Sequence, residues 1–150
     1  MVKIEYKIEF FEDDDPATIP YEYNDTIYGD IIICINNSVY SHMSSVLDYW
    51  INKLFEAVEC LKSNSDFTIK EIENSWDYLD FKKQDEQVTI SWLSDEAVKW
   101  REEIGYDEFA TEVVRVINEF ANELCEFDIR FKNSLVVTRL IQRLGNFIKG

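Results

Sequence analysis

The chain has 150 residues, with 30 acidic and 15 basic side chains and a formal net charge of −15. This length predicts a single domain. Hydrophobic residues make up 46% of the chain, which excludes a protein that stays disordered because of its charge. The negative field disfavours direct contact with nucleic-acid phosphates and favours a basic partner.

The charge is unevenly distributed along the chain. Up to Asp128 the sequence has 30 acids and 10 bases, whereas from Arg130 onward it has five bases and no acid. Cys34, Cys60 and Cys125 are widely spaced, which predicts reduced thiols, no zinc site and a cytoplasmic protein. No targeting segment is recognisable, and the longest apolar run is too short to span a membrane.

The first third of the sequence predicts two strands followed by a helix. Residues 2–10 alternate between apolar and charged side chains, as in a strand with one solvated face. Residues 26–36 predict a second strand, and its apolar centre predicts an interior strand covered on both faces. Ser44 or Ser45 then caps a helix that ends near Lys62.

The remaining sequence predicts a β meander followed by two helices. Strands are expected at 67–69, 76–81 and 88–92. Residues 95–104 fit either a further strand, in which Trp92 and Trp100 pair, or a helix capped by Ser94. Helices follow at 106–127, with Asp107 as its cap, and at 134–148, with Ile141 and Ile148 among its inward-facing residues.

These elements predict an α+β fold in one domain spanning residues 1–150, in the order ββα-βββ-αα. We expect one antiparallel-rich sheet of four to six strands, covered on one face by two or three helices. The candidate partner-binding residues are acidic or aromatic and lie within one short segment. They are Glu12, Asp13, Asp14, Asp15, Tyr21, Glu22, Tyr23 and Asp25.

Three interpretations of this acidic segment stay open: a docking surface, a cation site and a solvated loop. Contiguous carboxylates diverge, and no glycine precedes Gly29, so the segment lacks the ligand spacing of a calcium loop. The interleaved tyrosines favour docking, because tyrosine supplies contact area at low entropic cost. We therefore predict a basic protein partner and no metal or cofactor.

Residues with catalytic potential are sparse. His42 is the sole histidine, no Ser or Cys motif surrounds it, and it is expected in a loop or at a helix entry. Asp77 and Asp80, beside Trp76 and Tyr78, are the most suggestive carboxylate pair for sugar chemistry. The basic C-terminal residues either pack beside the acidic body or form a separate contact site. These residues are Arg130, Lys132, Arg139, Arg143 and Lys149.

In size, acidity and lack of catalytic motifs, the chain resembles the small cytoplasmic immunity proteins that neutralise bacterial toxins. The resemblance lies in general character, and no motif carries it. It implies a non-catalytic protein that occludes a basic partner, such as a nuclease toxin, with fast, salt-sensitive association. The alternatives are a small-molecule or carbohydrate-binding or hydrolysing domain, and a structural or assembly subunit.

Overall fold

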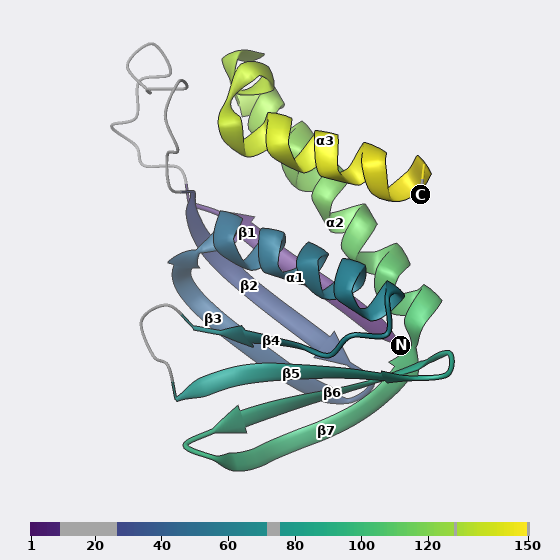
Figure 1. Cartoon of the computed structure of the whole chain (residues 1–150). Coiled ribbons are helices and arrows are strands. Elements are labelled where there is room, and N and C mark those ends of the chain that lie inside the picture. The colour runs from purple at the N-terminus through teal and green to yellow at the C-terminus, as the bar shows by residue number, and fades with distance from the viewer. Residues whose placement is uncertain (10–26, 72–75, 128, 150) are drawn as a thin grey trace.

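The computed structural model describes residues 1–9, 27–71, 76–127 and 129–149, which form two antiparallel sheets and three α-helices (Figure 1). The first sheet has the strand order β1-β2-β3, and the second has the order β4-β5-β6-β7. The elements are β1 Val2–Ile8, β2 Tyr28–Ile35, β3 Ser38–Val46, α1 Leu47–Lys62, β4 Phe67–Lys70, β5 Asp77–Gln84, β6 Gln87–Ser94, β7 Ala97–Gly105, α2 Tyr106–Phe127, the 3₁₀-helix η1 Ile129–Asn133 and α3 Leu135–Lys149. The predicted α+β class is confirmed, although the strands divide between two sheets rather than sharing one.

In the first sheet, the apolar side chains that alternate along β1 are buried on one face. Val2, Ile4 and Ile8 of β1 are buried, and β1 pairs with β2 from Val2 opposite Ile35. β2 is the central strand, as expected, but its burial alternates. Ile32 and Cys34 are partly exposed, so the expectation that β2 is covered on both faces is wrong for the described residues.

The strand β3 and the start of α1 differ from the sequence prediction. β3 was not predicted because its polar residues hide the pattern, and it places His42 in a strand rather than in a loop. The helix begins at Leu47, and Val46 at its N-cap forms no side-chain hydrogen bond. The hydroxyl of Ser45 instead donates a hydrogen bond to the carbonyl of Gly29 at 3.1 Å, so neither predicted serine cap is present.

The second sheet consists of consecutive hairpins. Residues 97–105 form strand β7 and not the alternative helix, and Trp92 pairs with Trp100 as predicted. The β6–β7 turn places Asp95 and Glu96 in the left-handed region, with φ angles of 52° and 65°. This turn therefore reverses the chain within two residues and interrupts any helical pattern.

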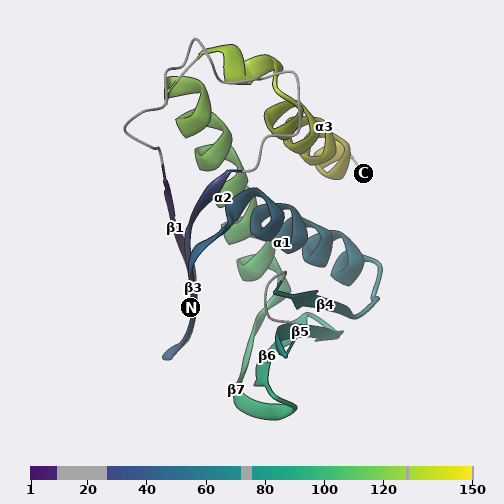
Figure 2. The same cartoon turned by 90° about the vertical axis from the view of Figure 1, so that its left-hand side faces the viewer.

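Helix α2 has the predicted bounds, with Asp107 in its first turn rather than before it. In α3 the hydroxyl of Ser134 accepts a hydrogen bond from the Val137 amide at 3.2 Å and caps the helix. Ile141 and Ile148 were expected inside, but they are 46% and 69% exposed. The core lies between the inner faces of the sheets and the helices α1 and α2 (Figure 2).

Candidate functional site

The predicted partner-binding residues in the segment 12–25 lie outside the described residues, but the chain on either side of this segment is well anchored. The Glu9 amide donates a hydrogen bond to the Tyr28 carbonyl at 2.9 Å. The Ile27 amide donates to Asp48 at 3.0 Å, at the start of α1. The described residues that flank this segment, Glu9 and Ile27, therefore lie close together, where β1 ends and β2 begins.

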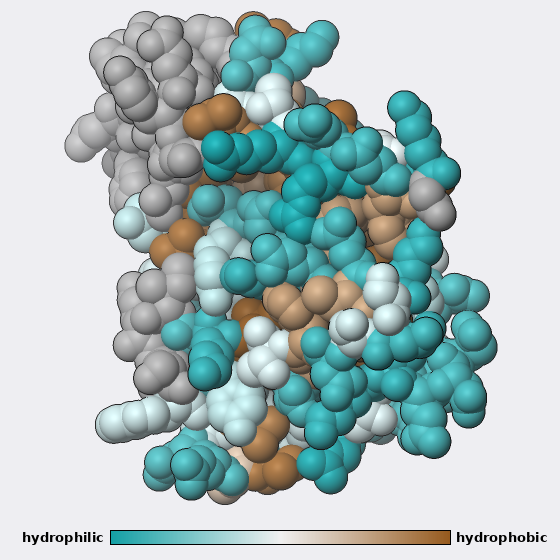
Figure 3. All heavy atoms as spheres, viewed as in Figure 1, coloured by the Kyte–Doolittle hydropathy of each residue, from teal (hydrophilic) through white to brown (hydrophobic). Residues whose placement is uncertain are grey.

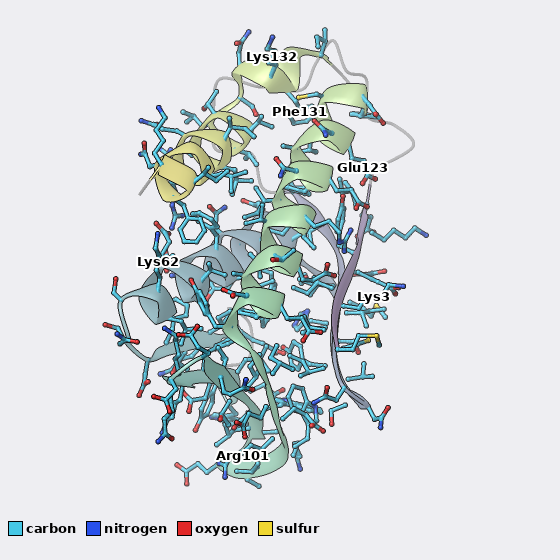
Figure 4. All side chains as sticks on the ribbon, turned by 90° about the vertical axis from the view of Figure 1, so that its right-hand side faces the viewer. Lys3, Lys62, Arg101, Glu123, Phe131 and Lys132 are labelled. Carbon is cyan, nitrogen blue, oxygen red and sulfur yellow. The ribbon has the colours of Figure 1, made fainter. Side chains whose placement is uncertain are left out.

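Helix α2 presents a row of glutamates beside the outer edge of β1. These residues are three, four or seven positions apart and therefore share one face of the helix. Figure 4 places Glu123 on the side of α2 that faces β1. We call this row the acidic stripe, and it consists of Glu108, Glu112, Glu119, Glu123 and Glu126.

The acidic stripe also holds the edge of β1 in place. The Val2 amide donates a hydrogen bond to Glu108 at 3.1 Å, and the Ile4 amide donates to Glu112 at 2.6 Å. The Tyr6 hydroxyl donates to Glu123 at 2.9 Å. Burial raises the pKa of Tyr6, and the nearby Glu123 carboxylate raises it further, so the hydroxyl stays a donor. On this edge β1 has no neighbouring strand among the described residues, and carboxylates of α2 accept the hydrogen bonds of its amides instead.

One basic residue, Arg115, interrupts the acidic stripe. Its guanidinium forms two hydrogen bonds with Glu112, at 2.6 and 2.8 Å, and one with Glu119 at 2.5 Å. It also donates to the Ile4 carbonyl at 2.8 Å. Burial acts to raise the pKa of Glu112, but hydrogen bonds from Arg115 and the Ile4 amide outweigh it and hold the pKa below the usual 4.5.

A groove of about 540 Å³ runs along the junction of β1 and α2. Its walls are the residues 1–6 on one side and Glu112, Arg115 and Glu119 on the other. The groove is open and charged, so it suits a polar protein surface better than an apolar small molecule.

A second polar arrangement, missed by sequence reasoning, lies between the two sheets. Glu71, at the end of β4, is only 7% exposed, and it accepts a hydrogen bond from the Tyr40 hydroxyl. The Nε2 atom of His42 lies 3.3 Å from the same carboxylate. Burial raises the pKa of Tyr40, and Glu71 raises it further, so this phenol also stays protonated. A buried carboxylate needs such partners, because an isolated charge is costly away from water.

Aromatic rings surround this polar cluster. Tyr40 lies 5.4 Å from Trp50 and 5.5 Å from Trp92, measured between ring centroids. Within the part of the chain that the structure describes, His42 Nδ1 and Trp92 Nε1 are buried without a hydrogen-bond partner. The cluster contains the imidazole of His42 and the carboxylate of Glu71. No described serine or cysteine bonds to His42, so the geometry does not form a nucleophilic triad.

The carboxylate pair singled out for sugar chemistry is not brought together. Asp77 and Asp80 are three positions apart in β5, so they point to opposite faces of the second sheet. Asp80 accepts a hydrogen bond from Thr68 at 3.1 Å on the outer face. Asp77 lies on the inner side, where its charge helps to raise the pKa of Tyr40, although less than burial and Glu71 do.

The basic C-terminal residues pack in part against the acidic body, as one interpretation expected. Arg143 of α3 lies 2.5 Å from Glu59 of α1, and its guanidinium stacks over Phe55 at 5.2 Å. A groove of about 350 Å³ separates these helices on the largely hydrophilic face seen in Figure 3. Because Arg143 pairs with Glu59 of α1, less positive charge remains on α3 for a separate contact site.

Comparison with family models, curated protein sequences and solved structures gives no match for this chain. Among the described residues, no three His, Cys, Asp or Glu side chains are grouped so that they could hold a metal ion. No helix in the described ranges is both long enough and apolar enough to cross a membrane. The three cysteines are free and half-buried.

Proposed function

We propose that this chain is a non-catalytic binding protein that occludes a more basic protein, such as a nuclease toxin. The observation that supports this proposal is the acidic stripe of α2. Five glutamates share one helix face, and Arg115 is the one basic residue of α2, so most of the negative charge of the stripe is not neutralised within the helix.

The stripe adds to the acidic residues that the sequence predicts for partner binding at 12–25. Tyr6 contacts Glu123, so the C-terminal part of the stripe lies beside the end of β1. Glu9, which precedes the acidic segment in the sequence, lies at this same strand end. In the proposed mechanism, these carboxylates meet the Lys and Arg side chains with which a nuclease holds phosphates. Complementary charge then accelerates the encounter and blocks the nucleic-acid site.

A basic protein is first captured on the immobilised chain at low salt. The test then measures the rate at which this basic protein associates with the wild-type chain and with its variants. Two variants remove charge by amide substitution. One carries Glu12→Gln, Asp13→Asn, Asp14→Asn and Asp15→Asn, and the other carries Glu119→Gln, Glu123→Gln and Glu126→Gln. We expect each to slow association about tenfold at low salt, and we expect the wild-type rate to fall steeply as salt rises.

A matched control neutralises four exposed carboxylates outside both regions, and none of the four forms an ion pair with a described residue. It carries Asp66→Asn, Asp85→Asn, Asp95→Asn and Glu96→Gln. This control changes net charge as much as the first variant, so the proposal expects it to bind nearly as fast as wild type. A wild-type rate that does not depend on salt contradicts the proposal, and so does an equal loss in the control.

A further inference from the structure

The first sheet has one face that no described element covers. In Figure 2 the helices α1 and α2 lie on one side of this sheet, and no described helix or strand lies on the other. Figure 4 shows Lys3 projecting from β1 away from the helices. We call this the outer face, and its residues are Lys3, Glu5, Lys7, Asp30, Ile32, Cys34, Val39, Ser41 and Met43.

The apolar residues of the outer face lie on the two neighbouring strands β2 and β3. Val39 is 51% exposed and Met43 is 57% exposed, and Cys34 lies directly opposite Val39 in the β2–β3 register. Ile32 of β2 is also partly exposed. The run from Ile31 to Ile35 has the composition of a strand covered on both faces, but the described chain covers only one of them. A second molecule can supply the missing cover.

The outer face is also electrically balanced in an otherwise acidic molecule. Lys3 and Lys7 offset Glu5 and Asp30, and Lys3 lies 2.9 Å from Glu5. Glu9, beside Lys7 and Asp30, leaves a local charge of about −1. A strongly basic partner is attracted to the acidic stripe rather than to a neutral surface. Two copies with a charge of −15 repel each other least where the local charge is near zero. We propose that the outer face binds a second copy of this chain.

In this dimer the same patch of each copy meets its mate around a two-fold axis. The two sheets stack about 10 Å apart, with the apolar residues of β2 and β3 from the two copies in contact. Three strands of this length outline about 14 by 27 Å, or about 400 Å². That is about half of the 800 Å² per partner of a standard stable interface, so the dimer is weak and concentration-dependent.

Sedimentation equilibrium of the full chain from about 5 μM to about 500 μM tests this proposal, because a small interface dissociates in this range. The weight-average mass should rise from 17.8 kDa toward twice that value. Added salt should strengthen the dimer by screening the repulsion between the two acidic chains. The electrostatic partner binding proposed above weakens with salt, so the opposite signs separate the two associations. A wild-type chain that stays monomeric throughout overturns the dimer.

A variant pair locates the interface. Val39→Lys with Met43→Lys should weaken dimerisation at least about tenfold, because two half-exposed apolar side chains are replaced by charges. The control, Ile141→Lys with Ile148→Lys, adds the same charge at two exposed isoleucines of α3 and should leave dimerisation close to wild type. The outer face is not the interface if the control disrupts the dimer as strongly as the Val39/Met43 variant does, or if only the control disrupts it.

Thiol alkylation provides a second measurement that does not depend on these variants. Cys34 lies on the outer face, on the central strand β2, whereas Cys60 and Cys125 lie on α1 and α2. Alkylation of Cys34 by iodoacetamide should slow as protein concentration rises, and the rates at the other two cysteines should not change. A Cys34 rate that is independent of concentration, in a sample that dimerises, places the interface elsewhere.

Discussion

At the scale of single residues, Arg115 connects helix α2 to strand β1. It bonds to two glutamates of its own helix and to the backbone of β1. Its fork of donors suits this geometry, because a guanidinium binds a carboxylate through two parallel hydrogen bonds and keeps further N–H groups for a carbonyl. Removing it leaves Glu112 without its counter-charge and the Ile4 carbonyl without its donor.

We therefore predict that Arg115→Met lowers the free energy of unfolding by about 2 kcal/mol, measured by urea denaturation. Arg115→Lys should recover only part of this loss, because an ammonium group cannot form the paired contact. The matched control is Lys53→Met, which breaks the Lys53–Glu56 pair within α1, 3.1 Å apart. Its loss should stay below about 0.5 kcal/mol, and an equal loss in both variants contradicts a special role for Arg115.

The buried cluster shows why single residues were harder to assign from sequence than elements. Tyr40 and His42 are two positions apart, so they share a face of β3, and Glu71 continues the inward face of Ile69 in β4. Those local patterns were available in the sequence. The meeting of β3 with the end of β4 was not, because it depends on the packing of two sheets whose boundary no local pattern marks.

At the scale of elements, two glycines give opposite expectations for the same substitution. A Cβ on Gly145, within α3, meets nothing within 4 Å, whereas a Cβ on Gly29 lies 2.2 Å from the Lys7 carbonyl oxygen and 2.9 Å from Leu47. Gly145 therefore weakens its helix without a packing reason. Gly29 is required where β1, β2 and α1 approach closely.

We predict that Gly145→Ala stabilises the protein by about 0.5–1 kcal/mol, through higher helix propensity, and raises the melting temperature by about 2–4 °C. Gly29→Ala should destabilise it by about 1–3 kcal/mol, because the backbone of β1 must shift. Thermal unfolding followed by circular dichroism measures both. If Gly145→Ala is destabilising, the open space beside α3 must be occupied in solution.

The elements themselves were largely predictable where their apolar period was strong. The bounds of α2 matched because its stripe repeats over six turns between clear ends. β3 was missed because Val39 and Met43 face outward while His42 and Ser45 face inward, so no alternation of apolar and polar residues marks the strand. The cap of α1 was wrong because Ser45 binds the neighbouring strand instead. Ile141 and Ile148 follow the helical period of α3, but periodicity does not reveal how wide a face the rest of the fold covers.

At the scale of the whole molecule, the net charge of −15 and the local ion pairs respond to salt in opposite ways. Salt screens the repulsion among the excess carboxylates, which favours the folded state. It also weakens pairs such as Lys3–Glu5, but exposed pairs contribute little to stability. The long-range term should therefore dominate at neutral pH.

We predict that raising sodium chloride from about 10 mM to about 0.5 M at pH 7 increases the melting temperature by about 3–6 °C, since screening acts on the whole field. Near the isoelectric point of about 4.3 the net charge is close to zero, so this gain should vanish.

Acid also has a local effect. The pKa of Glu112 is lowered in the folded protein, so its contribution to stability is complete above pH 4.5 and is lost as pH falls through the folded pKa. Glu112→Gln should flatten the acid limb of stability against pH, while leaving the effect of salt at pH 7 almost unchanged. A melting temperature that falls with salt at pH 7 shows instead that local pairs outweigh the repulsion of the whole chain.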